Sequence, residues 1–227
     1  MMKHRKLLSF MLVLVISMLP IGGYALSNES TMEKFIPLQG GAFVTVRGSA
    51  ADLERIGEEE LRNIVEENGL QEGDVLYIEE VVTGEELRNF SEVPELFGYG
   101  VHTETTKKYI KNVVMKNRFL LSVGRGQTTT LTKEFSSGIS TKIIAGTAFI
   151  AGEIGGSITA RISTSHKFTG PPEGGKNNSR DYWIRYNGIH YSFTQKLYDE
   201  NNSLLSTRSG EAHVPVSYSI YSIDKKI

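Results

Sequence analysis

The sequence predicts an α+β protein that is mainly β, with a small N-terminal strand-helix-strand unit followed by an antiparallel β-sandwich or meander. Apolar residues recur at helical intervals over a useful length only in residues 50–68. In residues 103–227, Thr, Ser, Ile, Val and Tyr are abundant and turn residues recur at short intervals, which is typical of β-strands. We therefore expect a signal peptide at 1–25, an acidic α/β unit at 26–100 and an antiparallel β domain at 101–227.

The N-terminus has the pattern of a cleavable signal peptide. A basic stretch with Lys3, Arg5 and Lys6 precedes an apolar run over residues 7–18. This run of about a dozen residues is shorter than the roughly 20 that a membrane-spanning helix needs, so a permanent anchor is the weaker alternative. Small residues at Gly23 and Ala25 predict cleavage after Ala25, and hence a secreted, extracellular mature chain.

Composition narrows the function classes. The chain has no cysteine, which excludes disulfides, thiol catalysis and cysteine-ligated metals. An exported protein without cysteine is typical of Gram-positive bacteria. Removal of three cations with the signal peptide changes the formal charge from −1 to −4, which argues against nucleic acid as a partner.

The acidic unit contains the predicted strand-helix-strand. Residues 43–46 read as a strand, Ser49 stands three positions before Asp52 as in a helix cap, and residues 74–82 read as a second strand. Between them we expect one helix over residues 50–68. Acids dominate residues 52–95 and bases dominate residues 107–180, which indicates either two structural regions with a boundary near Pro94 or two solvated faces that attract each other.

Residues 131–168 form an amphipathic hairpin pattern with an unusual tip. In the second half, apolar residues alternate with Ser, Thr, Arg and Lys, and the apolar members are Ile154, Ile158, Ala160, Ile162 and Phe168. The first half is similar but diluted by Lys133. The tip, residues 144–152, is apolar and small and contains Phe149 and Ile150, whereas an ordinary surface turn is polar.

This segment resembles the membrane-inserting hairpin of aerolysin-type β-pore-forming proteins, in which two Ser/Thr-rich amphipathic strands flank an apolar tip. It also resembles the Ser/Thr/Gly-rich β domains of uncharacterised secreted proteins from Gram-positive bacteria. The first resemblance covers under a third of the chain and implies homo-oligomerisation and insertion into a membrane, with Phe149 and Ile150 exposed. Each arm has at least the roughly 9 to 11 residues of a membrane-spanning strand.

Two other structures fit the same residues. The arms could be half-buried strands of a β-sandwich whose tip is covered by another part of the chain. Alternatively, residues 143–158 could form a helix with Ala148, Gly152 and Gly156 on one face, although the glycine content disfavours that helix in water.

The C-terminal part contains the clearest local turn signal. Asn187-Gly188 supplies the residue types of a two-residue hairpin turn, which predicts that Ile184 pairs with Tyr191 and that Tyr182 pairs with Phe193. Further strands are expected at residues 204–208 and 214–223, and a loop at residues 170–175.

No catalytic or metal-binding motif stands out, and we expect no cofactor. The histidines lack the spacing of a ligand set, and there is no Gly-x-Ser-x-Gly elbow. Trp183, Arg185 and His190 share the polar face of the predicted hairpin. The leading hypothesis is a non-enzymatic protein that associates with a membrane, cell envelope or partner protein through the amphipathic hairpin. The alternative is a secreted hydrolase or carbohydrate-binding module that uses the Trp183 face.

Overall fold

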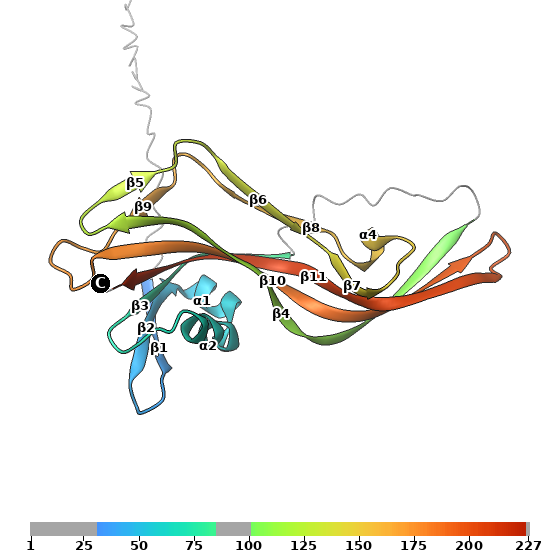
Figure 1. The fold of residues 1–227 in the computed structure, drawn as a ribbon, viewed down its shortest axis with the longest axis horizontal. Coiled ribbons are helices and arrows are strands. Elements are labelled where there is room, and N and C mark those ends of the chain that lie inside the picture. The colour runs from blue at the N-terminus through green and yellow to red at the C-terminus, as the bar shows by residue number, and fades with distance from the viewer. Residues whose placement is uncertain (1–30, 85–100, 226–227) are drawn as a thin grey trace, which may run out of the picture.

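The computed structural model describes residues 31–84 and 101–225. The signal peptide and the proposed boundary near Pro94 lie outside these residues. Within them the protein is mainly β with a short helical unit near the N-terminus, as the sequence predicts. Three very long strands form the body of the molecule: β4 (His102–Gly124), β10 (Ser179–Tyr198) and β11 (Leu204–Lys225) (Figure 1).

A single large sheet runs through the described part of the chain in the order β1-β2-β3-β11-β10-β4. Strand β10 lies in its centre and pairs antiparallel with β11 on one side and β4 on the other. The N-terminal unit joins this sheet because β3 (Val75–Thr83) pairs with the second half of β11, from Ser217 to Asp224. The acidic and basic regions of the sequence therefore share one sheet.

The N-terminal unit forms as its local sequence predicts, with one interruption. Strand β2 (Phe43–Ser49) pairs parallel with β3, and the added strand β1 (Thr31–Pro37) pairs antiparallel with β2. The Ser49 side chain caps the following helix by accepting a hydrogen bond from the Asp52 backbone N–H. The single helix expected here is two helices, α1 (Ala50–Ile56) and α2 (Glu58–Glu67), because Gly57 adopts φ 73° between them.

The predicted hairpin turn at Asn187-Gly188 is wrong. Both residues lie inside β10, where Ile184 pairs with Ile220 and Arg118 instead of Tyr191. The ladders on both sides of β10 outweigh the local turn preference, and the register shifts beside Asn187 on both neighbouring strands. Neighbouring atoms lie too close to Gly188 for a side chain. A Cβ there would lie 2.5 Å from Met115 Sδ and 2.8 Å from the Val214 carbonyl oxygen.

The segment between β4 and β10 folds back over the sheet. It contains five short strands and one short helix: β5 (Thr128–Thr130), β6 (Phe135–Ser140), β7 (Lys142–Gly146), α4 (Ala151–Ile154), β8 (Ser157–Ile162) and β9 (Lys167–Thr169). We call residues 128–169 the hairpin segment. The expected loop at residues 170–175 follows it, and the two strands expected near the C-terminus are one continuous strand, β11.

The two faces of the large sheet carry different layers. Helices α1 and α2 pack on one face around a core that includes Leu61, Ile64 and Tyr221. The hairpin segment packs on the other face, over Ile184, Tyr186 and other residues that alternate with the first set. In Figure 1, α1 and α2 lie below the long strands, whereas β6, β8 and α4 lie above them.

Candidate functional site

The arms of the hairpin segment form a layer of their own. Strand β6 pairs antiparallel with β8, and β5 pairs with β9, without joining the ladder of the large sheet. The alternation predicted for the second arm is present: Ile158, Ala160 and Ile162 are buried, whereas the residues between them are exposed. The arms are thus held mainly by one apolar face.

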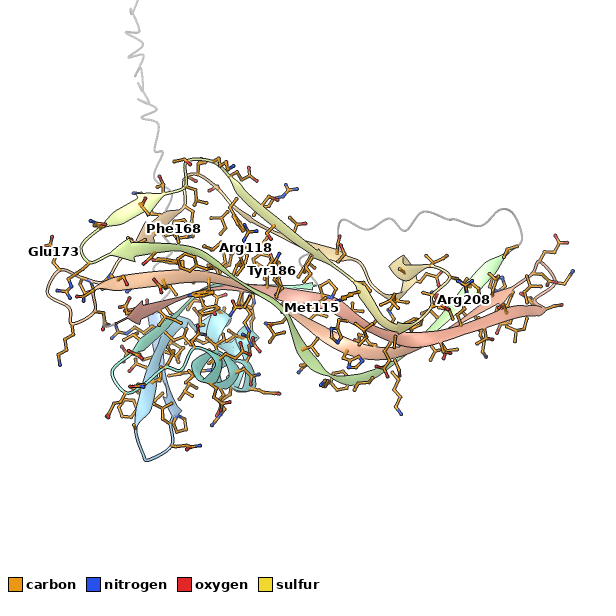
Figure 2. All side chains as sticks on the ribbon, in the orientation of Figure 1. Met115, Arg118, Phe168, Glu173, Tyr186 and Arg208 are labelled. Carbon is orange, nitrogen blue, oxygen red and sulfur yellow. The ribbon has the colours of Figure 1, made fainter. Side chains whose placement is uncertain are left out.

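Two tyrosine hydroxyls of β10 also hold the arms. The Tyr186 hydroxyl donates to the Ser137 carbonyl oxygen at 2.8 Å, and the Tyr182 hydroxyl donates to the Thr169 carbonyl oxygen at 2.8 Å. Burial raises the pKa of both phenols above 10.0, so they remain donors over the physiological range. Tyr186 and Phe168 lie between the large sheet and the hairpin segment (Figure 2).

The tip is attached differently, through the backbone. Strand β7 pairs antiparallel with β11, from the pair Gly146 and Gly210 to the pair Lys142 and His213. This part of β11 precedes the part that pairs with β3. Gly146 has φ 73°, and a Cβ on it would lie 2.1 Å from the Ser209 carbonyl oxygen, so glycine is required here. Four residues of ladder therefore tie the tip to the long strand.

Gln195 is the main side-chain anchor of the tip. It is fully buried, and its Oε1 accepts from the backbone N–H groups of Phe149 at 2.7 Å and Ile150 at 3.3 Å. Its Nε2 donates to the Ile150 carbonyl oxygen at 2.9 Å and to the carboxylate of Glu153 at 3.2 Å. One side chain of β10 thereby satisfies three backbone groups of the tip.

Charged and polar residues of the long strands complete this attachment. Glu153 of α4 accepts hydrogen bonds from the hydroxyls of Thr103 and Thr105, which lie on β4. Lys107 Nζ donates to the Ile154 carbonyl oxygen at 2.9 Å. Arg208 of β11 donates to the Ala148 carbonyl oxygen at 2.9 Å and places its guanidinium 4.3 Å from the centre of the Phe149 ring.

The tip is covered only in part. Ile150 is 7% exposed and Phe149 is half-buried, so the two residues that the pore-former resemblance would expose are shielded in this structure, whereas Ile144 of the same tip is 40% exposed. The helix alternative for residues 143–158 is wrong in its extent, because only Ala151–Ile154 is helical. Sequence reasoning missed Gln195 and Arg208, which bind the tip and α4 from 42 to 60 residues away, and it missed Glu153 of α4, whose partner Thr105 is 48 residues away.

The structure does not gather Trp183, Arg185 and His190 into one site. Trp183 is partly buried against the helical core, with its ring 5.2 Å from that of Phe119. Arg185 is fully buried beneath α2 and forms ion pairs with Glu60 and Glu67. Burial lowers the pKa of Arg185, but hydrogen bonds and charge from these carboxylates raise it overall, so the side chain stays charged.

His190 lies farther along β10 and has a carboxylate partner that the sequence did not predict. Its Nε2 lies 2.9 Å from Glu211 Oε2, and its Nδ1 is buried without a partner among the described residues. A general base needs a ring nitrogen that a substrate proton can reach, whereas here Nε2 is engaged by Glu211 and Nδ1 is buried. The hydrolase hypothesis therefore gains no support from His190.

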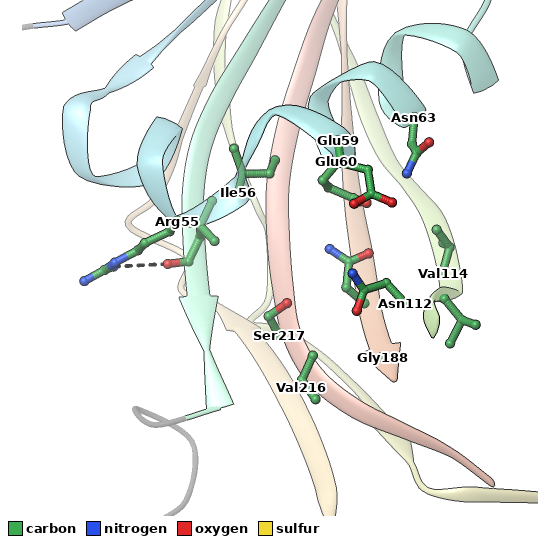
Figure 3. Close-up of a pocket in the computed structure, with 13 residues that line it drawn as sticks. Arg55, Ile56, Glu59, Glu60, Asn63, Asn112, Val114, Gly188, Val216 and Ser217 are labelled. Atoms are coloured by element: carbon green, nitrogen blue, oxygen red, sulfur yellow. Dashed lines mark hydrogen bonds between the residues drawn. The ribbon is translucent and has the colours of Figure 1, made fainter. Parts of the chain in front are cut away.

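Two grooves lie on the large sheet. One, of about 230 Å³, lies where α2 meets the long strands and is lined by Glu59, Glu60, Asn63 and Asn112 among others (Figure 3). The other, of about 590 Å³, is lined by four Ser and Thr side chains, Lys108, Glu211, Phe193 and small residues of β7 and β11. Neither groove contains a histidine, and the described residues hold no cluster of three or more His, Asp or Glu that could bind a metal.

No helix in residues 31–84 and 101–225 is long and apolar enough to cross a membrane. Comparison with protein-family models, with curated proteins and with solved structures finds no match to this chain. The functional argument therefore depends on the hairpin segment itself.

Proposed function

We propose that this protein associates with a membrane by releasing the hairpin segment from the large sheet and inserting it into the bilayer. The observation that carries the proposal is the separate layer formed by β6 and β8. Because this layer is held by side chains and by the ladder between β7 and β11, it can move away once that ladder opens, without breaking the ladders that join β4, β10 and β11 to one another.

The chemistry of the arms fits a bilayer after release. Membrane-spanning strands alternate apolar residues toward lipid with polar residues toward water. Strand β8 already has this pattern, with Ile158 and Ile162 on one face and Thr159 and Arg161 on the other. Lys133 lies at the base of the arm, near the expected membrane interface, where a lysine costs roughly 0 to 1 kcal/mol.

Insertion also requires more than one copy of the chain. A single inserted hairpin would leave the outer N–H and C=O groups of both arms unpaired in hydrocarbon, which costs several kcal/mol for each group. Hairpins from neighbouring copies satisfy these groups by pairing side by side. The proposal therefore includes a homo-oligomer in the membrane and a tip that reaches the far aqueous side.

A reversible covalent lock tests the proposal. Ala145 of β7 and Glu211 of β11 are direct cross-strand partners, and such partners have the Cα separation that a disulfide needs. The chain has no cysteine, so Ala145→Cys with Glu211→Cys gives one defined bond. We expect purified mature protein to release dye from liposomes, the oxidised double variant to release none, and reduction to restore release.

The control is the single variant Ala145→Cys, whose activity should not depend on oxidation. Equal dye release from the oxidised and reduced double variant would refute insertion of this segment. Absence of both liposome binding and dye release by the unmodified protein, at neutral and at mildly acidic pH, would refute the membrane function as a whole.

A further inference from the structure

Four basic side chains lie in one row across the sheet at the point where the tip begins. Lys111 of β4 pairs with His190 of β10, His190 pairs with His213 of β11, and His213 pairs with Lys142 of β7. Side chains directly opposite each other in an antiparallel sheet point to the same face. The rings of His190 and His213 lie 5.0 Å apart. The row therefore brings two titratable groups between two lysines.

Only one acid faces this row from the described elements. Glu211, two residues before His213 on β11, pairs with His190 at 2.9 Å. A protonated His190 would thus be neutralised by Glu211, whereas a protonated His213 would meet Lys142 on one side and the His190–Glu211 pair on the other. Neither Lys142 nor Lys111 has an acidic partner among the residues that the structure describes.

We propose that acidification releases the tip, because protonated His213 repels Lys142 and so weakens the pairing of β7 with β11. This inference rests on the proposed function, for which it supplies the trigger: the hairpin segment is stored at neutral pH and freed in a mildly acidic compartment or at an acidic surface. The repulsion acts at the ladder between β7 and β11, which holds the tip.

The direction of the effect follows from the pKa of His213. Burial, His190, Lys142 and Lys111 lower this pKa from its ordinary value of 6.5, and Glu211 opposes them only in part. The docked state therefore favours neutral His213. Docking of the tip has its full stability above pH 6.5 and loses stability as the pH falls below that value. When β7 leaves, Lys142 leaves with it, so the detached state binds the proton more tightly.

Hydrogen exchange of the mature protein tests the release without a membrane. Exchange is measured by mass spectrometry at about pH 7.5 and about pH 5.5, with exposure times scaled to the chemical exchange rate, since histidine titrates between these values. We expect amides of β7 to lose protection at the lower pH, because the detached state binds the proton of His213 more tightly than the docked state does. Amides of α2 and β3 should keep their protection.

Three variants assign the cause. His213→Gln should keep β7 protected at both pH values. Lys142→Glu gives protonated His213 an acidic neighbour, so acidification should then strengthen protection of β7. His166→Gln, a control in the same segment whose ring packs on Phe168, should respond as the unmodified protein does.

The outcomes separate the trigger from the proposed function. Equal β7 protection at both pH values, or loss of protection in His213→Gln or Lys142→Glu as in the unmodified protein, overturns the acid trigger even if liposomes leak. Release of β7 at low pH without dye release at any pH supports the acid response and refutes membrane insertion.

Discussion

Replacing Gln195 with methionine should loosen the tip while leaving the rest of the fold intact. Methionine has a similar length but no hydrogen-bonding groups, so the backbone N–H groups of Phe149 and Ile150 and the Ile150 carbonyl lose their partner. Each buried group left unsatisfied costs about 1 to 3 kcal/mol. We therefore expect docking of the tip to weaken by about 3 kcal/mol, which corresponds to roughly a 100-fold change in the opening equilibrium.

Hydrogen exchange at neutral pH measures this change directly. Amides of β7 should exchange about 100-fold faster in Gln195→Met, whereas amides of the helical core, which Gln195 does not contact, should be unchanged. Dye release from liposomes should also become faster, because more molecules have a free tip. The matched control is Gln71→Met, since Gln71 is exposed and distant in sequence from the tip.

Protection of β7 in Gln195→Met within about threefold of that in the unmodified protein would refute the role of Gln195, because unsatisfied buried groups could not cost so little. Uniform loss of protection across all elements would also refute it, because the tip would then not open independently of the sheet.

Four further substitutions probe single contacts by thermal or urea unfolding. Ile150→Asp should lower the free energy of unfolding by about 3 kcal/mol or more, because it buries an unpaired charge. Phe149→Asp should lower it by less than about 1 kcal/mol, because Arg208 lies over that ring. Equal losses for the two variants would contradict the observed packing. Arg185→Met should lower the free energy of unfolding by about 2 kcal/mol, since it leaves Glu60 and Glu67 without their cation, although both carboxylates retain some solvent contact. A change below about 0.5 kcal/mol would show that the buried ion pairs contribute little. Gly188→Ala should cost about 1 to 3 kcal/mol through its contact with the Val214 carbonyl oxygen, and an unchanged midpoint would show that the strands do not approach so closely.

Local signals in the sequence predicted local structure well. The cap at Ser49, the strands around it and the alternation in β8 all follow from interactions within a few residues, and the structure contains each of them. Gln195 and Glu153 could not be predicted in the same way, because their partners become neighbours only after the hairpin segment folds over the sheet.

The Asn187-Gly188 turn shows the reverse case. These residues favour a turn in a short peptide, but β10 has a partner strand on each side over nearly its whole length. A ladder of that extent decides the backbone conformation, and the glycine is used for its small size. Residues typical of turns predict a turn only where the segments on both sides of them do not pair more extensively with other strands.

The pairing of β3 with β11 constrains the order in which the chain can fold. Ser222 of β11 contacts Glu79 of β3 across 143 residues of sequence, so the sheet closes only after a very long loop has been brought together. Contacts of such high sequence separation make folding slow. Until β11 arrives, β3 has a free edge and the N-terminal unit exposes part of its core. Refolding of this protein should therefore be limited by the docking of its last described strand, and intermediates that lack β11 should be the species most prone to aggregate.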